Sequence, residues 1–385
     1  MKKALMMAHV ASMIDLFNMD NIHILQDMGY EVDVACNFEN GSVTSWQRVN
    51  EFKQELISQG INVYHIPVPR NITAIGNIAE SYRIIKQLTR SKHYDIVHCQ
   101  SPIGGVIARL ACKKARKHGT KVIYVAHGFH FYKGASIKNW MLFYPIEKYC
   151  ARYTDCLITM NQEDYNFAQR KMNKAKHIKY IPGVGINTQE INSIDVDIDS
   201  KRKELGIPAN STIIVSVGEL NRNKNHEVII RALAEINNSN IHYIICGKGP
   251  LKDYLMKLSK ELHLDQNVHI LGYRKDVIEI LKSSDIFAFP SIREGLSVSM
   301  MEAMAAGLPV VCSEIRGNTD LIKDGEGGII VKTTDIMAYA ISIRKIMGDD
   351  QLINYMGEFN RIKIKEFDRN IVSIDMKHIY KYCSS

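Results

Sequence analysis

Residues 285–307, DIFAFPSIREGLSVSMMEAMAAG, consist of an apolar run, a short polar loop and a stretch with helical periodicity. The apolar run Asp285–Pro290 has the length of a buried strand, and the helical stretch covers Val298–Ala306. A buried strand that leads through a loop into a helix is the repeating unit of a parallel sheet covered by helices on both faces. This stretch therefore predicts an α/β fold.

The same alternation continues along the chain in both directions. Strand-like runs in the first half are Lys3–His9, Glu31–Cys36, Ile61–Ile66, Asp95–Cys99, Lys121–Ala126, Asp155–Met160 and Ile178–Pro182. Those in the second half are Thr212–Val217, Ile241–Cys246, Val268–Leu271, Asp285–Pro290, Pro309–Cys312 and Gly328–Val331. Helical stretches between them include Phe17–Met28, Thr73–Thr89, Ile103–Lys117, Val228–Ile236, Leu251–Leu262 and Val277–Lys282. The last fifty residues have only helical patterns.

The alternation stops between residues 183 and 211, where glycines, Pro208 and a polar run carry no strand signal. We therefore predict two tandem Rossmann-like β/α/β domains that face a central cleft. They span residues 1–187 and 188–365, and a C-terminal helix, 366–385, is expected to pack back on the first. Because such sheets bind ligands beyond the carboxyl ends of their strands, functional residues are expected in the strand-to-helix loops.

Composition excludes several classes of protein. The 385 residues are 46% hydrophobic and 23% charged, which is typical of globular domains and not of disordered, collagen-like or small disulfide-rich chains. No apolar run approaches the ~20 residues that span a bilayer, and MKKALMMAHVA at the start is interpreted as a first buried strand rather than a signal peptide. No C-x-x-C pair occurs, which favours reduced, packed thiols and a cytoplasmic setting. The cysteines within or beside strand-like runs are Cys36, Cys99, Cys156, Cys246 and Cys312.

Charge is distributed unevenly. The chain carries a formal net charge of +8, and residues 1–187 hold 24 basic and 14 acidic side chains, so all the excess positive charge lies in the first half. A basic half suits an anionic partner such as a membrane surface, a polyphosphate or a nucleic acid. Ordinary solvated lysines give the same count, and both interpretations stay open.

Two glutamates follow the strand Asp285–Pro290, with seven residues between them. Glu294 lies in the loop, where a carboxylate can accept hydrogen bonds from sugar hydroxyls, and amides near Gly295–Ser297 can donate to hydroxyls or anionic oxygens. Glu302 lies one turn inside the helix, where it can bind the two cis hydroxyls of a ribose. The alternative interpretation without a ligand is that Glu294 caps the helix and Glu302 is an ordinary solvent-exposed helix residue.

Two further loops contain residues suited to catalysis. Lys224 lies in VGELNRNKN, residues 217–225, where its ammonium can neutralise a departing diphosphate. His127 follows the strand Lys121–Ala126 in AHGFHF, residues 126–131. No carboxylate or cysteine joins His127 and His130 at ligand spacing, so we predict no metal site there.

These motifs together resemble those of the retaining, nucleotide-sugar-dependent glycosyltransferases of family 4, which have the GT-B fold. The Glu294-x7-Glu302 stretch resembles the hallmark of that family, and VGELNRNKN resembles its diphosphate loop. ICGKGP at residues 245–250 is similar to the next strand-to-helix loop. HCQSPIGG at residues 98–105 and AHGFHF are similar to segments of the bacterial exopolysaccharide and capsule branch.

The resemblance implies an activity. A hexose-type sugar passes from a UDP-sugar to a lipid-diphosphate-linked saccharide in surface polysaccharide synthesis, with retention of the anomeric configuration and without a metal cofactor. The first domain binds the acceptor and the second binds the nucleotide sugar. The implied catalytic residues are His127, Lys224 and Glu294. The implied nucleotide-sugar contacts are Gly218, Arg222, Lys224, Gly249, Glu294, Gly295, Leu296, Ser297 and Glu302. The implied acceptor contacts are Phe129, His130, Gly104 and Gly105.

The chain departs from the family pattern at two loops. Glu219 follows Gly218 where many members carry an arginine, and either Arg222 or Arg293 is the candidate that supplies this charge. After the first strand, residues 10–14 lack the glycines that many members place there.

Two segments bear on the location of the protein. Arg109–His118 is strongly basic, and Lys138–Tyr149 combines aromatic residues with lysines. The second segment fits either a lipid interface or a core helix. With the resemblance, it predicts a cytoplasmic protein in peripheral contact with the anionic inner face of the cell membrane.

Three alternative functions are weighed. A nucleotide-sugar epimerase has the same architecture, and a non-catalytic nucleotide- or sugar-binding protein would also keep the fold. Nucleic-acid binding lacks any recognised module in the sequence, so no nucleic-acid partner is predicted. The chain has no G-x-G-x-x-G after its first strand, no P-loop and no G-x-S-x-G, which argues against dehydrogenases, P-loop NTPases and α/β-hydrolases.

Overall fold

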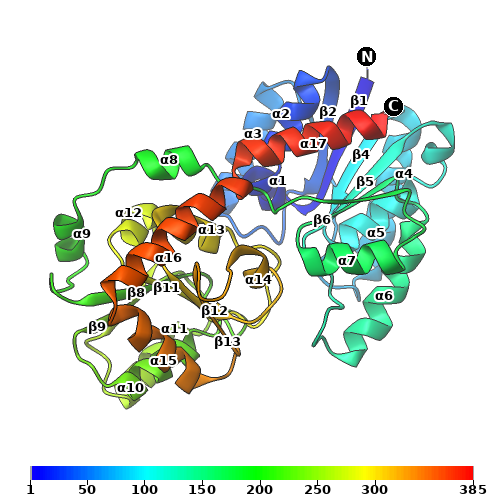
Figure 1. The fold of residues 1–385 in the computed structure, drawn as a ribbon. Coiled ribbons are helices and arrows are strands. Elements are labelled where there is room, and N and C mark those ends of the chain that lie inside the picture. Colours follow the sequence, from blue (N-terminus) through cyan, green and yellow to red (C-terminus); the bar gives the residue numbers. More distant parts are fainter. Residues whose placement is uncertain (1, 385) are drawn as a thin grey trace. The chain divides into compact units, whose positions relative to one another are not determined.

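The computed structural model describes residues 2–384, which form two compact units (Figure 1). The first unit holds the described residues up to Val184 and from Val372 onward, and the second holds Gly185–Ile371. The chain therefore passes from one unit to the other twice. Within the second unit these two passages are joined, because Ile186 accepts a backbone hydrogen bond from Arg369 at 2.8 Å and Thr188 Oγ1 donates to Asp368 Oδ2 at 2.6 Å.

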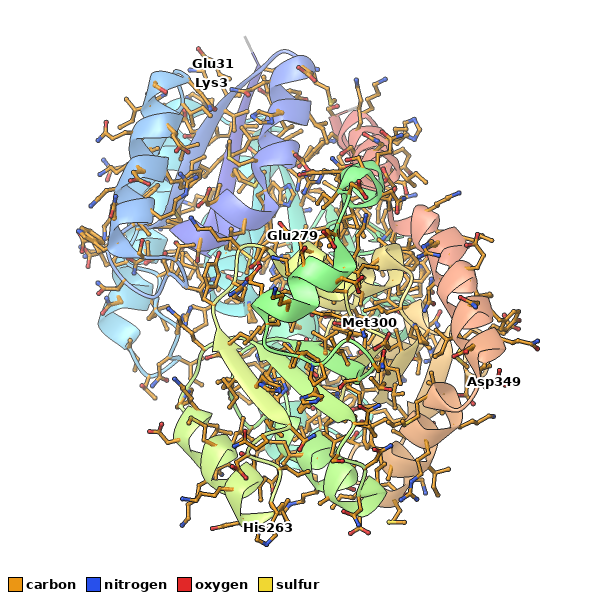
Figure 2. The ribbon with its side chains drawn as sticks, turned by 90° about the vertical axis from the view of Figure 1, so that its left-hand side faces the viewer. Lys3, Glu31, His263, Glu279, Met300 and Asp349 are labelled. Atoms are coloured by element: carbon orange, nitrogen blue, oxygen red, sulfur yellow. The ribbon has the colours of Figure 1, made fainter. Side chains whose placement is uncertain are left out.

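A seven-stranded parallel sheet forms the centre of the first unit. Its strands are β1 (Lys2–Val10), β2 (Tyr30–Asn37), β3 (Asn62–His65), β4 (Ile96–Gln100), β5 (Lys121–Ala126), β6 (Cys156–Thr159) and β7 (His177–Tyr180). They lie in the order β3-β2-β1-β4-β5-β6-β7, with Lys3 of β1 opposite Glu31 of β2 (Figure 2). The order reverses between β1 and β4, and ligands of open α/β sheets bind at such a switch point.

Helices cover both faces of this sheet. One apolar core joins the sheet to α1 (Ala11–Phe17), α2 (Met19–Asp27), α3 (Trp46–Ser58) and α17 (Arg369–Ser384). The other joins it to α4 (Ile75–Lys92), α5 (Pro102–Ala111), α6 (Ile137–Ala151) and α7 (Gln162–Lys171). The C-terminal helix α17 belongs to the first unit through buried apolar residues and Tyr380, whose hydroxyl lies 2.6 Å from Nδ1 of the buried His98 in β4.

The second unit repeats this plan with a six-stranded parallel sheet. Its strands are β8 (Thr212–Val217), β9 (Ile241–Cys246), β10 (Val268–Gly272), β11 (Ile286–Phe289), β12 (Val310–Ser313) and β13 (Gly328–Val331). They lie in the order β10-β9-β8-β11-β12-β13, so this sheet has its switch point between β8 and β11.

Two apolar cores flank the second sheet as well. One contains α8 (Thr188–Ser193), α12 (Val277–Lys282), α13 (Val298–Ala306), α14 (Asn318–Leu321) and the 3-10 turn η2 (Ile364–Phe367). The other contains α10 (His226–Ile236), α11 (Lys252–Glu261), α15 (Ile336–Met347) and α16 (Asp350–Lys363). The short helix α9 (Ile198–Glu204) lies near the start of the unit. In the first of these cores, Met300 of α13, labelled in Figure 2, is fully buried.

Some predicted elements have different bounds. The helix expected over Ile103–Lys117 ends at Ala111, and a 3-10 turn, η1 (Ala115–His118), follows it. Like charges four residues apart, such as Lys113 and Lys117, destabilise a continued α-helix. All eight cysteines are buried and unbridged, as expected for packed thiols. Among residues 2–384, no helix has both the length and the apolar character needed to cross a bilayer.

Candidate active site

The loop between β8 and α10 begins at Gly218 and ends at Asn225. Asn225 has a left-handed backbone with φ of 54°, and its amide group donates to the carbonyls of Pro290 and Thr333 at 3.2 and 3.1 Å. The backbone N–H of Lys224 donates to Asn221 Oδ1 at 3.0 Å. These bonds fix the loop at the switch point of the second sheet.

A second loop, between β11 and α13, is joined to the first. The Ile292 N–H donates to the Asn223 carbonyl at 2.8 Å, and Asn223 Nδ2 donates to the Arg293 carbonyl at 2.9 Å. Lys224 Nζ lies 2.8 Å from Glu294 Oε1, and both side chains are more than four-fifths buried. The structure thus places two predicted catalytic residues, Lys224 and Glu294, in one ion pair.

Close backbone packing holds this arrangement. A Cβ at Gly218 would lie 3.0 Å from Lys224 Cε, so the absence of a side chain leaves room for the lysine stem. Gly317 precedes α14 with φ of +81°, and a Cβ there would lie 1.5 Å from the carbonyl oxygen of Gly295. Gly249 packs similarly against the backbone of Leu220. Of the three predicted contacts, Gly249 lies where a side chain would overlap neighbouring backbone, Gly218 faces the Lys224 stem, and the Gly295 carbonyl contacts the bare backbone of Gly317.

The helix α13 begins at the Ser297 cap, whose hydroxyl accepts from the Met300 N–H at 3.4 Å. Leu296 packs against the core below this loop. Glu302 lies one turn into the helix, and its carboxyl makes no hydrogen bond or ion pair with another residue in the described part of the chain. Burial raises its pKa to about 7. Glu302 is therefore a carboxylate without a partner, beside the loops at the switch point.

Arg222 and Arg293, the two candidates for the missing phosphate-binding charge, are both exposed. Arg222 lies on the β8–α10 loop, two residues before Lys224. Arg293 lies on the β11–α13 loop, directly before Glu294. Neither guanidinium has an ion pair among residues 2–384, so both are available to an anionic ligand.

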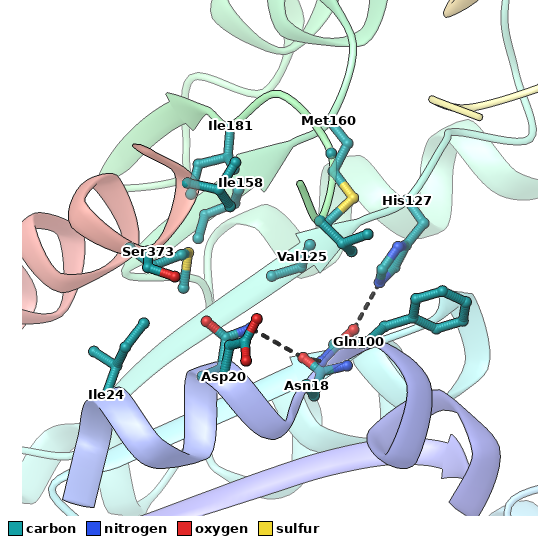
Figure 3. A pocket seen from close by; sticks show the side chains of 16 residues that line it. Asn18, Asp20, Ile24, Gln100, Val125, His127, Ile158, Met160, Ile181 and Ser373 are labelled. Atoms are coloured by element: carbon teal, nitrogen blue, oxygen red, sulfur yellow. Dashed lines mark hydrogen bonds between the residues drawn. The ribbon is translucent and has the colours of Figure 1, made fainter. Parts of the chain in front are cut away.

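In the first unit, the predicted residue His127 follows β5 and borders a pocket near the switch point (Figure 3). The His127 Nε2 atom lies 2.6 Å from Gln100 Oε1, and Gln100 ends β4. Burial, with a smaller contribution from His9, lowers the pKa of His127 to about 4, so the imidazole is neutral at pH 7. The polar residues that line the pocket are Asn18, Asp20, Asn21, Gln100, His127 and Ser373.

The predicted acceptor contacts fall into two groups. The ring of Phe129 is buried against Phe131, and a Cβ at Gly105 would lie 2.3 Å from the Tyr124 ring, so these two positions serve packing. Gly104 is also buried, in the first turn of α5. His130 is half-buried, with its ring centroid 4.6 Å from that of Phe143. The structure does not gather these four residues around the pocket, whose lining includes none of them.

Sequence reasoning missed the pocket residues Asn18, Asp20, Asn21 and Gln100. Gln100 ends a strand at the switch point, but that fact follows only from the strand order. The helix α1 begins at Ala11, directly after β1 ends at Val10, so no loop separates the two elements. Within residues 2–384, no three His, Cys, Asp or Glu side chains gather as a metal site would require.

Two parallel Rossmann-like sheets in one chain, each with its switch point between its first and fourth strands in chain order, are the architecture of GT-B glycosyltransferases. Comparison with known proteins agrees. Residues 197–363 match the family described as glycosyl transferases group 1, and residues 5–161 match the glycosyl transferase 4-like family. The chain belongs to this family of glycosyltransferases.

The similarity to known relatives and to solved structures extends over nearly the whole chain. EpsD of Bacillus subtilis (strain 168), which is named as a glycosyltransferase, is 35% identical over 98% of this chain and 96% of its own length. The Escherichia coli UDP-Gal:alpha-D-GlcNAc-diphosphoundecaprenol alpha-1,3-galactosyltransferase is 28% identical over 93% and 91%. The crystal structure of Anabaena Alr3699/HepE in complex with UDP and glucose has the same fold, with a TM-score of 0.77 at 20% identity, covering 99% of this chain and 100% of that one.

Proposed function

We propose that this glycosyltransferase moves a hexose-type sugar from a UDP-sugar to a lipid-diphosphate-linked saccharide, with retention of the anomeric configuration. The observation that carries the proposal is the site at the second switch point, where Lys224 and Glu294 pair beside the partnerless Glu302. The E. coli relative named above acts on a UDP-sugar and a diphosphoundecaprenol-linked acceptor by its name, which supports the same substrate classes. The alternatives, an epimerase or a binding protein, are not favoured.

Each donor-site residue has a proposed role that follows from its chemistry. Glu302 is a buried carboxylate whose lone pairs have no donor, so the two ribose hydroxyls supply the hydrogen bonds that it lacks. Glu294 orients the sugar, together with backbone around Gly295 and Ser297. Lys224 supplies positive charge where the diphosphate gains negative charge, in a loop too buried for water to screen it fully. Arg222 or Arg293 adds a second charge from the solvent side.

The proposed reaction step follows from these roles. The bond between the anomeric carbon and the diphosphate oxygen breaks, and the electron pair leaves with the diphosphate, stabilised by Lys224. The acceptor hydroxyl attacks the same face, and its proton passes to the departing diphosphate oxygen. Glu294 is already paired with Lys224 at 2.8 Å, which suits an electrostatic role better than nucleophilic attack. No metal is needed in this scheme, and transfer is expected to be unchanged by EDTA.

His127 is proposed to act on the donor sugar, and His130, whose side chain is only half-buried, remains a proposed acceptor contact. His127 is neutral and half-buried, so its ring can exchange a hydrogen bond with a sugar hydroxyl without adding charge. His127→Ala is expected to lower kcat for transfer while the affinity for UDP stays unchanged. A variant with wild-type kcat would remove His127 from the proposed catalytic residues.

A cytoplasmic location with peripheral contact to an anionic membrane is part of the proposal, and the helix α6 supports the membrane contact. Trp140 and Tyr144 pack into the core, whereas Ile137 and Met141 are 76% and 67% exposed. Lys138 and Lys148 flank these apolar side chains. Exposed apolar residues interleaved with cations are typical of helices that lie in a lipid interface.

Vesicle binding tests the membrane contact. Met141→Asp is expected to weaken flotation with vesicles containing anionic lipid, and uncharged vesicles should bind the wild type weakly. Met256→Asp on α11 is the matched control, because Met256 is also a half-exposed methionine on a helix. Equal flotation of both variants would contradict the assignment of α6.

Calorimetry with UDP tests the donor site, with UMP and GDP as controls for the diphosphate and the base. Saturable UDP binding that is lost in Glu302→Ala supports the proposal. A folded wild type that binds no nucleotide would overturn it. Incubation with a UDP-sugar and no acceptor then separates the enzyme classes, because an epimerase interconverts sugars and a transferase only hydrolyses the donor slowly.

A further inference from the structure

A hydrogen-bond chain leads from the backbone of α1 to His127, and its direction is fixed at one end. Asn18 Nδ2 donates to the Met13 carbonyl oxygen at 2.8 Å. A backbone carbonyl can only accept, so the nitrogen of this amide must face Met13. The Asn18 Oδ1 atom therefore faces the opposite way, where it accepts from Asn21 Nδ2 at 3.1 Å and from Gln100 Nε2.

The second amide of the chain must then have one orientation. Gln100 Nε2 faces two groups that accept, Asn18 Oδ1 and the Met6 sulfur at 3.8 Å. Gln100 Oε1 consequently faces His127, with Nε2 of the ring 2.6 Å away (Figure 3). An amide oxygen carries no hydrogen, so the proton of this bond must reside on His127 Nε2.

We propose that Asn18 and Gln100 are positioning residues that hold His127 in its Nε2–H tautomer and leave Nδ1 as an acceptor for a hydroxyl of the sugar substrate. The identity of that substrate rests on the proposed function, whereas the tautomer rests on the hydrogen-bond chain alone. A neutral ring has one donor and one acceptor nitrogen, so fixing one fixes the other. No residue of the described chain donates to Nδ1, which leaves it available to a ligand.

Both amides are required for this result. A side-chain amide can rotate by 180° and exchange its oxygen and nitrogen. If Gln100 rotated, its NH2 group would face His127 Nε2 and would select the Nδ1–H tautomer, which donates at Nδ1 instead of accepting. Asn18 prevents this rotation, although no hydrogen bond joins it to His127. Asn18 and Gln100 would therefore influence the reaction only through the tautomer and orientation of the His127 ring.

Nitrogen-15 NMR of the ring nitrogens tests the proposal in the free protein at neutral pH. Loss of one signal set in His127→Gln assigns the resonances. The wild type is expected to show His127 as a single neutral Nε2–H tautomer. Finding the Nδ1–H tautomer would overturn the proposal, whatever the enzyme transfers. The result is independent of nucleotide binding, so failure of the proposed function would show separately in the calorimetry.

Variants then test each amide. Asn18→Leu is expected to give a mixture of tautomers and to lower kcat about tenfold, as the loss of one typical hydrogen bond does, with the affinity for UDP unchanged. Asn21→Leu removes a side branch of the chain and should keep the single tautomer. Adding Gln100→Glu to Asn18→Leu should restore Nε2–H, because a carboxylate presents only acceptors to the ring.

A second route covers a poorly folded Asn18 variant. Gln100→Leu removes the acceptor next to His127 and is also expected to produce mixed tautomers. A single Nε2–H tautomer in both Asn18→Leu and Gln100→Leu would show that the amides have only a structural role. Fully mixed tautomers in Asn21→Leu would contradict the inference that the Met13–Asn18 bond orients the chain without help from Asn21.

Discussion

The carboxyl edges of the two sheets share a strand order and differ in chemistry. At the second switch point the loops carry Lys224, Glu294 and Glu302, three ionisable groups that are largely buried. At the first switch point a neutral histidine is joined to Gln100 and Asn18. The comparison shows that the strand order determines where a ligand binds, whereas the charge of the side chains determines which chemical groups of the ligand bind there. A charged edge suits a diphosphate and a ribose, and an edge with two linked amides, an imidazole and the Asp20 carboxylate suits the hydroxyls of a sugar.

The two edges are also held in different ways. In the second unit, backbone groups of one loop contact backbone groups of the next, as Gly317 does with Gly295. In the first unit, side-chain amides link α1, β4 and the loop after β5. Substitution of the tightly packed Gly317 should therefore act through steric overlap in the second unit, and substitution of the linked amides through hydrogen-bond direction in the first.

The largest effect is expected for Gly317→Ala. Its Cβ would lie 1.5 Å from the Gly295 carbonyl oxygen, so the β11–α13 loop must move. We expect a loss of about 3 kcal/mol in the free energy of unfolding and a marked loss of UDP affinity. Gly325→Ala is the matched control, because Gly325 also has positive φ, +77°, but no atom within 4 Å of its Cβ position. Urea unfolding of both variants measures this, and equal losses would show that the loops are not interlocked.

The next effect concerns charge at the second edge. Lys224→Met leaves Glu294 unpaired and removes the positive charge from the proposed diphosphate site. UDP affinity is expected to fall by about 10- to 100-fold, in line with the loss of a hydrogen bond to a charged group. Lys257→Met also breaks a lysine–glutamate pair, with Glu261 at 3.7 Å, but on an exposed face of α11. Calorimetry should find its UDP affinity unchanged, and a similar loss there would contradict a localised charge effect.

Glu302→Gln should separate stability from binding. Because the folded pKa of Glu302 is raised to about 7, ionising this carboxyl costs free energy only in the folded state, and stability is lost as the pH rises from about 4.5 through 7. At pH 8 the free energy of unfolding of the variant should thus exceed that of the wild type by about 1–3 kcal/mol. Below about pH 4.5 the variant should show no gain.

The same variant should bind UDP about tenfold more weakly at pH 8, since an amide has one oxygen to accept hydrogen bonds and the carboxylate has two. Wild-type affinity for UDP is expected to strengthen between pH 6 and 8 more than that of the variant. A variant with the wild-type pH dependence would remove Glu302 from the donor site. Titration of the UDP phosphate affects the wild type and the variant equally, so the difference between their pH profiles reports on Glu302 alone.

The smallest effect is expected away from both edges. Tyr380→Phe removes a buried hydroxyl 2.6 Å from His98 Nδ1, and we expect a loss of about 1–2 kcal/mol in unfolding free energy. Tyr382→Phe is the control, because the Tyr382 hydroxyl lies 3.4 Å from His177 on an exposed surface. Neither variant should alter UDP affinity. A change in UDP affinity for Tyr380→Phe would show that the two units are less independent than their separate cores indicate.

The strands were predictable because parallel strands buried on both faces form continuous apolar runs. The helices α3 and α7 were not among the predicted helices, because both are polar on average, although their apolar residues do recur at helical spacing. The donor-site candidates were found because Glu294 and Glu302 share one strand–loop–helix stretch. The Asn18–Gln100–His127 chain joins residues 82 and 27 positions apart, and no local pattern reveals such a contact.

The C-terminal helix α17 has a consequence for synthesis. It completes the apolar core of the first unit, yet it is translated after the whole of the second, Gly185–Ile371. At ribosomal rates of about 5–20 residues per second, the nascent first unit waits roughly 10–40 s before Val372 and Tyr380 can cover its sheet. The part of the molecule that leaves the ribosome first is therefore among the last to be finished, and its open apolar face is the natural target for a chaperone during that interval.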